Sequence, residues 1–133
     1  MILAVRTDKP EAELYLFDGQ KQVATTQWHA HRELSNTLLD RIELLLKDAG
    51  IDKTNLTAII VYKGPGSFTG LRIGITVANT MAYSLRIPIV AASGNDELWY
   101  ENSIQMLLHK APQKNIAIMP HYGAEVRITA PKK

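Results

Sequence analysis

Residues 63–74, with the sequence KGPGSFTGLRIG, constrain the fold more than any other part of the chain. They follow residues 56–62, a short apolar run rich in β-branched side chains that predicts a buried strand. They precede residues 71–85, which contain no proline and are long enough for a helix. We therefore predict that residues 64–69 form a loop between a strand and a helix.

The composition of this loop favours a tight turn over a phosphate site. Gly64 and Gly66 can adopt positive φ angles, and Pro65 fixes the turn between them. Ser67 or Thr69 can cap the helix with a side-chain oxygen. A P-loop needs a lysine after its last glycine, and a dinucleotide fingerprint needs a shorter glycine spacing. The loop is therefore interpreted as a structural signature, with a nucleotide-phosphate role as the less favoured alternative; its residues are Gly64, Pro65, Gly66, Ser67, Phe68 and Thr69.

The predicted helix that follows is almost free of charge, since Arg72 is its only charged residue. Ordinary surface helices carry one apolar stripe and a charged opposite face. A helix with so little charge is covered on more than one side, and a chain of 133 residues has little core to spare. Small residues at every fourth position also make a stripe where another backbone can approach closely; they are Gly70, Gly74, Ala78 and Ala82. These features predict a partner.

The composition is that of an ordinary globular domain, with 46% apolar and 21% charged residues. A net charge of +2 is too small to indicate nucleic acid or an anionic membrane as a partner. The absence of cysteine excludes disulfides, thiolate ligands and a cysteine nucleophile. No apolar run approaches the length of a membrane span, and the N-terminus has the pattern of a strand and not of a signal peptide. We expect a cytoplasmic protein.

The remaining strands follow from apolar runs and turn signals. Residues 2–5, 11–17 and 20–28 predict three antiparallel strands, the last two joined by a hairpin at Asp18 and Gly19. Residues 89–92 predict a further buried strand, and residues 115–119 a last short one.

Two more helices are predicted. Residues 33–49 have apolar side chains at three- and four-residue spacing, and Gly50 follows as the C-terminal cap. The expected buried face is formed by Leu34, Leu38, Leu39, Ile42, Leu45, Leu46 and Ala49, and widened by Leu44. Residues 95–109 predict a third helix, capped by Ser93, with Leu98, Ile104, Leu107 and Leu108 facing inward.

The run GPGSFTGLRIG at residues 64–74 resembles the signature of the TsaB (YeaZ) family. These bacterial proteins are needed for threonylcarbamoyl modification of the tRNA adenosine next to the anticodon. The resemblance extends more weakly over residues 1–93 and returns in the sequences PHY at 120–122 and ITAPKK at 128–133.

The resemblance implies an α/β fold of the ribonuclease H-like type, a half-domain of the actin-like ATPase superfamily. The predicted order of strands and helices matches that half-domain, with a mixed five-stranded sheet and helices on both faces. Residues 1–119 would form the single domain and residues 120–133 an extended tail. The chain looks like a shortened member of the family, without most of the second half, and the role of residues 94–119 is left open.

The resemblance also implies partners. In the family, TsaB pairs with TsaD, the subunit that transfers the threonylcarbamoyl group, in a complex that recruits the ATPase TsaE. We expect a TsaD heterodimer, a homodimer when the chain is alone, and tRNA contact that is indirect or weak. No catalytic residue, cofactor or metal is expected. The expected interface lies on the first two helices, at Leu34, Leu38, Arg41, Ile42, Leu45, Gly70, Leu71, Gly74, Ile75, Ala78, Met81 and Ala82.

An enzyme, either peptidase-like or ATP-binding, is the alternative. Catalytic members of the superfamily end the first strand in an aspartate, and the family commonly has Asp-Thr there. This chain has Arg6 and Thr7, and a guanidinium cannot ligate a cation. Asp8 is a less favoured substitute. His29 and His31 could offer two imidazoles to a metal, but no third ligand is indicated.

Direct tRNA contact by the tail is a third possibility. His121 and Tyr122 could stack on a base, and Arg127, Lys132 and Lys133 could contact phosphates. The sequence leaves this open, together with the question whether the chain still recruits TsaE.

Overall fold

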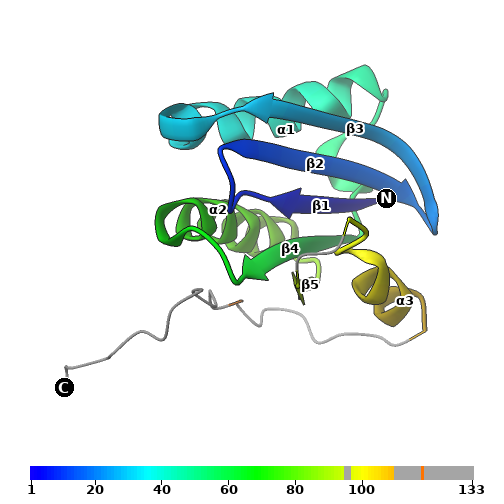
Figure 1. The fold of residues 1–133 in the computed structure, drawn as a ribbon. Helices are drawn as coiled ribbons and strands as arrows, with labels where there is room; N and C mark the ends of the chain where they lie inside the picture. Colours follow the sequence, from blue (N-terminus) through cyan, green and yellow to red (C-terminus); the bar gives the residue numbers. More distant parts are fainter. Residues whose placement is uncertain (95–96, 110–117, 119–133) are drawn as a thin grey trace.

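The computed structural model describes residues 1–94, 97–109 and 118. These residues form a five-stranded sheet in the order β3-β2-β1-β4-β5 (Figure 1). The strands are β1 (Ile2–Arg6), β2 (Glu11–Asp18), β3 (Lys21–His29), β4 (Ala58–Gly64) and β5 (Ile89–Ser93). The first three pair antiparallel, whereas β4 and β5 lie parallel to β1. The predicted mixed sheet is confirmed.

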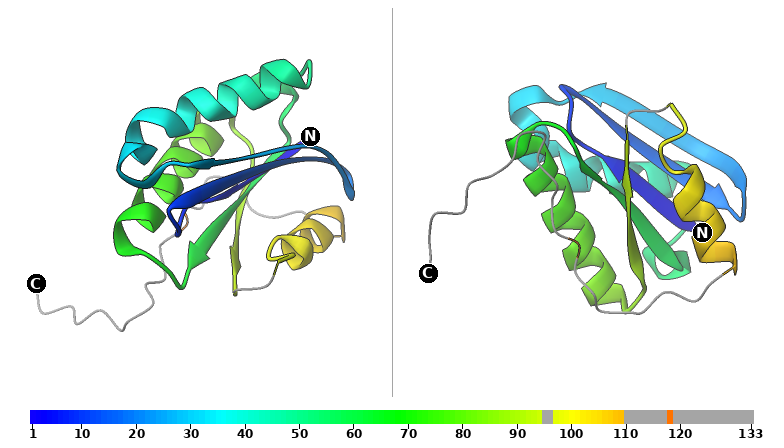
Figure 2. Two further views of the ribbon diagram at one scale, coloured as in Figure 1. Left: turned by 45° about the horizontal axis from the view of Figure 1, so that its top comes forward. Right: turned by 60° about the horizontal axis from the view of Figure 1, so that its bottom comes forward.

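Helices cover both faces of this sheet. Helices α1 (Leu34–Asp48) and α2 (Phe68–Leu85) lie on one face, and α3 (Glu101–His109) lies on the other (Figure 2). Side chains alternate along the first strand accordingly. The Thr7 side chain, just past β1, faces α2, whereas the Arg6 side chain lies near the Trp99 ring on the α3 side.

Strand β4 is the centre of the core because helices cover it from both sides. Its residues Ile59, Ile60, Val61 and Tyr62 are at most 1% exposed. A strand with both faces buried has a continuous apolar run instead of an alternating one, as residues 58–62 do. Each such side chain contributes about 1.5–3 kcal/mol by leaving water.

The turns follow the sequence signals closely. Gly19, with φ 63°, opens the two-residue loop between β2 and β3, one residue later than predicted. Gly50, with φ 71°, follows α1, and its N–H donates to the carbonyl oxygen of Lys47. Two 3₁₀ turns, His31–Glu33 and Lys53–Asn55, flank α1.

The prediction for the third helix was wrong in two respects. The helix begins at Glu101, after a turn at residues 97–100, and Ser93 ends β5 instead of capping a helix. Leu98 and Leu108 are 56% and 41% exposed, whereas Trp99 and Tyr100 are buried. The turn places two adjacent aromatic rings against the sheet, so helical periodicity could not identify them.

The buried face of α1 is also narrower than predicted. Leu39 and Leu44 are 48% and 49% exposed, on opposite flanks of the buried face. Each α-helix residue is rotated by about 100° from the one before it, which puts these two leucines outside the sector that contacts the sheet.

Some predictions fall outside the described residues. These are the strand at 115–119, apart from Ile118, and the tail at 120–133, including His121, Tyr122, Arg127, Lys132 and Lys133. Among the helices that the structure describes, none has the length and apolar character needed to cross a bilayer.

Candidate partner-binding site

The signature loop and the start of α2 are pinned to the end of β1. The Thr7 hydroxyl donates a 2.7 Å hydrogen bond to the Gly70 carbonyl oxygen. A Cβ atom at Gly70 would overlap the Thr7 carbonyl oxygen, and one at Gly74 would overlap the Thr7 side chain. Gly70 and Gly74 of the small-residue stripe therefore accommodate the end of the chain's own first strand, and the expected contact of the stripe with a partner stays a prediction.

The glycines of the loop have different reasons for being glycine. Gly64 has φ 117°, a conformation that side chains disfavour, and its peptide bond to Pro65 is cis. At Gly66 the reason is space, because a Cβ atom there would overlap Asp8. Ser67 precedes the first residue of α2, but its side chain accepts no capping hydrogen bond. The Tyr62 hydroxyl ties the loop down by donating to the Pro65 carbonyl oxygen at 2.9 Å.

Arg6 and Asp8 form a buried ion pair at the end of β1, where the sequence analysis considered a catalytic aspartate. The Arg6 Nε donates to Asp8 Oδ1 at 2.7 Å, and both side chains are 5% exposed. The guanidinium lies 3.9 Å from the centre of the Tyr62 ring. Burial alone would lower the pKa of Arg6, but the hydrogen bond and charge of Asp8 raise it overall. Arg6 is thus ion-paired with Asp8, the residue that was considered as a substitute for the aspartate that this chain lacks at the end of β1.

Glu13 is the second buried charge on the same face. Its Oε1 accepts from the Tyr15 hydroxyl at 2.7 Å and from the Trp99 indole N–H at 3.3 Å. Its Oε2 lies 2.9 Å from Lys9 Nζ. Burial alone would raise the pKa of Glu13, but the hydrogen bonds from Tyr15 and Lys9 outweigh it and lower the pKa. Burial, followed by the bond to Glu13, raises the pKa of Tyr15.

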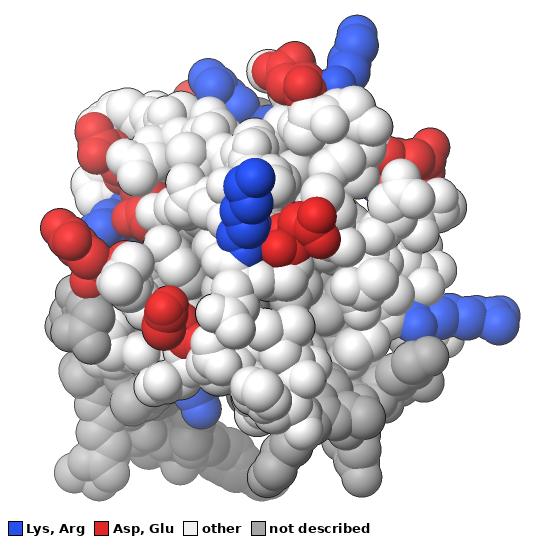
Figure 3. Space-filling model, turned by 90° about the vertical axis from the view of Figure 1, so that its right-hand side faces the viewer, with Lys and Arg blue, Asp and Glu red and all other residues white. Residues whose placement is uncertain are grey.

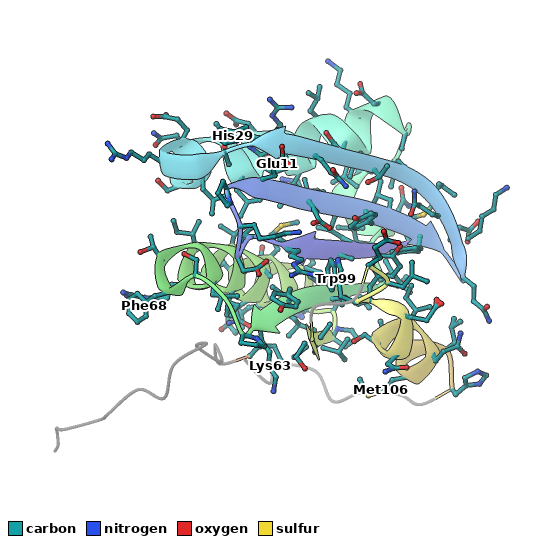
Figure 4. All side chains as sticks on the ribbon, viewed as in Figure 1. Glu11, His29, Lys63, Phe68, Trp99 and Met106 are labelled. Atoms are coloured by element: carbon teal, nitrogen blue, oxygen red, sulfur yellow. The ribbon has the colours of Figure 1, made fainter. Side chains whose placement is uncertain are left out.

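The buried carboxylates Asp8 and Glu13 are both engaged in hydrogen bonds. Over the described residues, every buried side-chain nitrogen and oxygen has a hydrogen-bond partner. The same part of the chain brings together no group of three histidine, aspartate or glutamate side chains that could hold a metal. His29, one of the two histidines considered as metal ligands, is exposed at the end of β3. Trp99, which bonds to Glu13, lies over the central strands (Figure 4). The polar network links β1, β2 and the turn before α3.

The predicted interface residues lie mainly inside this chain's own core. Only Arg41 and Gly70 are partly exposed, and Arg41 lies over the Trp28 ring at 5.2 Å. The others pack against the sheet and against one another; they are Leu34, Leu38, Ile42, Leu45, Leu71, Gly74, Ile75, Ala78, Met81 and Ala82. These side chains shape the helix pair, but other residues of the same helices form its surface.

The open surface of the helix pair is a hollow of about 370 Å³ between α1 and α2, which we call the α1–α2 groove. Leu39, which is 48% exposed, lies one helical turn after Ser35 on the same side of α1. The groove continues into a second hollow of about 480 Å³ at the end of β1, which shares Thr69 and Ile73 with it. The groove itself is lined by Ser35, Thr69, Arg72, Ile73, Thr76 and Val77.

The residues that line this groove differ from the interface residues expected from the sequence. Ile73 and Val77 are partly buried, and Thr76 is exposed. Phe68 is 50% exposed at the start of α2, where Figure 4 shows it projecting outward, with Arg72 5.2 Å from its ring. Threonine and valine at positions where a surface helix would carry charge were the signal that could have identified the groove.

Charge on another face of the molecule is dispersed. Figure 3 shows lysine, arginine, aspartate and glutamate side chains scattered singly, without a continuous basic patch on the face in view. A surface that binds the phosphates of a nucleic acid needs clustered cations, and the described residues of this face do not form such a cluster.

Similarity to solved structures shows that this chain is a ribonuclease H-like, actin-like α/β domain. Crystallised YeaZ from Pseudomonas aeruginosa is similar, with a TM-score of 0.65 and 30% sequence identity over 69% of this chain and 43% of that protein. A second structure, of an uncharacterized protein with similarity to the peptidase YeaZ, superposes with the same TM-score of 0.65.

Sequence relatives agree. A family described as TsaD, tRNA N6-adenosine threonylcarbamoyltransferase, matches residues 22–118. The tRNA threonylcarbamoyladenosine biosynthesis protein TsaB of Bacillus subtilis is 36% identical over 73% of this chain and 42% of its own length. TsaB of Buchnera aphidicola is 31% identical over 70% of this chain and 44% of its own length. The chain belongs to the TsaB (YeaZ) family, within the wider family that the matched TsaD description covers, and it spans less than half of these relatives.

Proposed function

We propose that this chain is a non-catalytic, protein-binding subunit in the biosynthesis of threonylcarbamoyladenosine in tRNA, and that its partner is TsaD. The observation that supports this most strongly is a contrast within the domain. Asp8, the carboxylate at the strand end that carries catalysis in the actin-like superfamily, is held in an ion pair with Arg6, while the α1–α2 groove presents apolar side chains.

The argument against catalysis rests on the state of Asp8. Both Asp8 oxygens accept hydrogen bonds from Arg6, at 2.7 and 3.2 Å, and the positive charge of the guanidinium opposes the binding of a metal cation to the same carboxylate. Releasing Asp8 would leave a buried guanidinium without its counter-charge, which is costly. We therefore disfavour the peptidase and ATPase alternatives.

The argument for a partner rests on the surface of the helix pair. Ile73 and Val77 present apolar area along the groove, and Arg72 is the one cation among the described residues that line it. Leu39, which is 48% exposed, lies on the Ser35 side of α1. An interface core is depleted in charge and surrounded by a polar rim, which Ser35 and Thr76 begin to supply. We propose this surface in place of the buried residues expected from the sequence, and we propose that it also forms the homodimer when the chain is alone.

The proposals for the other partners depend on the complex with TsaD. We propose that TsaE joins through the complex that this chain forms with TsaD, and that contact with tRNA is indirect or weak, since the face seen in Figure 3 has no continuous basic patch. The proposed location is the cytoplasm, where tRNA is modified.

The function can be tested by complementation. Cells depleted of their own TsaB should regain threonylcarbamoyladenosine in tRNA, measured by mass spectrometry of nucleosides, when this chain is expressed with its own TsaD. Leu39→Glu should abolish the recovery, whereas Leu44→Glu should retain it, because the two leucines are 48% and 49% exposed but only Leu39 lies beside the groove. Recovery that is equal for both variants, or absent with the unmodified chain, would contradict the proposal.

A further inference from the structure

The side-chain amide of Asn79 holds a backbone segment from the far end of the described chain. Its Nδ2 donates to the carbonyl oxygen of Ile118 at 3.0 Å, and its Oδ1 accepts from the Ile118 N–H at 3.0 Å. One side chain thus pairs with both polar groups of a single residue, as a neighbouring strand would. The sequence analysis had not singled out Asn79.

Asn79 lies on the side of α2 next to the α1–α2 groove. At about 100° per residue it is roughly 20° around the helix from Arg72 and roughly 60° from Thr76, both of which line the groove. Ile75, one turn earlier, is 4% exposed, and Ile118 itself packs against the core. Ile118 follows the last residue of α3 by nine positions, although α3 covers the opposite face of the sheet from α2 (Figure 2).

The Asn79 side chain bonds only to backbone groups of Ile118. Such a contact suits an extended backbone and does not require a particular side chain on the bound residue. A neutral amide offers one donor group and one acceptor, which match the backbone C=O and N–H of a residue. Asparagine is a weaker helix former than alanine, so Asn79 is not explained by the stability of α2 alone. Its reciprocal hydrogen bonds supply the explanation.

We propose that the flank of α2 around Asn79 is a docking site for an extended peptide backbone, and that its occupant is this chain's own residue Ile118. The site holds Ile118 against α2 through the two polar groups of its backbone. It does not depend on the identity of the partner that binds the groove.

The test is hydrogen exchange of the full-length chain, followed by NMR. The Ile118 amide should exchange at least about tenfold more slowly in the unmodified protein than in Asn79→Ala, since a hydrogen-bonded amide exchanges only on opening. Asn79→Asp should give an intermediate rate, because a carboxylate still accepts from the Ile118 N–H but cannot donate to its carbonyl oxygen. Thr80→Ala, at the next and exposed position of α2, is the matched control and should leave the rate unchanged.

Core amides such as that of Leu3 report whether each variant remains folded. Ile118→Pro leaves α2 intact and removes only the N–H donor, so the side-chain amide signals of Asn79 should move toward those of the exposed Asn102. The proposal is overturned if the Ile118 amide exchanges equally fast in the unmodified protein and in Asn79→Ala. Unchanged Asn79 signals in Ile118→Pro would overturn it as well.

Discussion

The Thr7 side chain fills the space that a side chain at Gly74 would occupy, and this contact fixes the distance between β1 and α2. The same threonine donates to the Gly70 carbonyl oxygen at 2.7 Å, so one residue holds two successive turns of the helix. Glycine at both positions lets the helix backbone come within contact of the strand. The glycine spacing in the family signature therefore has a structural explanation within this one chain.

Gly74→Ala is expected to destabilise the protein by about 1–3 kcal/mol, because the new methyl group must displace the Thr7 side chain. Urea denaturation measures the loss. Combining it with Thr7→Ala, which removes the overlapping atoms, should give a total smaller than the sum of the two single effects. Strictly additive effects would show that the two residues are not in contact as described.

Asp8→Ala should cost about 3 kcal/mol or more, because it leaves the Arg6 guanidinium buried without its partner. Asp18→Ala, which removes an exposed carboxylate at the end of β2, is the control and should change stability by less than about 0.5 kcal/mol. Replacing both partners, Arg6→Met with Asp8→Ala, should recover part of the loss. If Asp8→Ala and Asp18→Ala have the same effect in thermal denaturation, the buried pair does not exist in solution.

Glu13 should make stability depend on pH. Its folded-state pKa lies below the ordinary value of 4.5, so its contribution is complete above that pH and is lost as pH falls through the lowered pKa. The difference in unfolding free energy between the unmodified protein and Glu13→Gln should thus be about 1–3 kcal/mol at pH 7 and shrink in acid. Urea titrations at pH 7, 5, 4 and 3 measure it. A difference that stays constant or grows toward pH 3 would show that the Glu13 carboxylate is not stabilised by folding.

Local signals in the sequence predicted most of the fold. Alternation and apolar runs located all five strands of the sheet, and Gly19 and Gly50 marked the end of β2 and of α1 because each turn requires a positive φ. These features depend on a few neighbouring residues, which is why a single sequence contains enough information to predict them.

The features that escaped prediction depend on contacts between distant segments. Gly74 was assigned to a partner because nothing in the sequence indicates that Thr7 lies against it. Trp99 and Tyr100 were missed because a turn, and not a helix, presents them to the sheet, where Trp99 bonds to Glu13 from 86 positions away. The groove that we propose lies on the same two helices as the interface residues expected from the sequence, but on their outer surface.

The most direct test of the proposed function is the mass of the complex that this chain forms with the TsaD of its own organism, measured by light scattering after gel filtration. We expect one heterodimer, retained in Leu44→Glu and lost in both Leu39→Glu and Thr76→Arg, with all three variants folded by circular dichroism. Gly74→Arg and Ala78→Arg are unsuitable because both positions are buried in the core. A heterodimer that survives both groove substitutions, or no complex with the unmodified chain, would contradict the account.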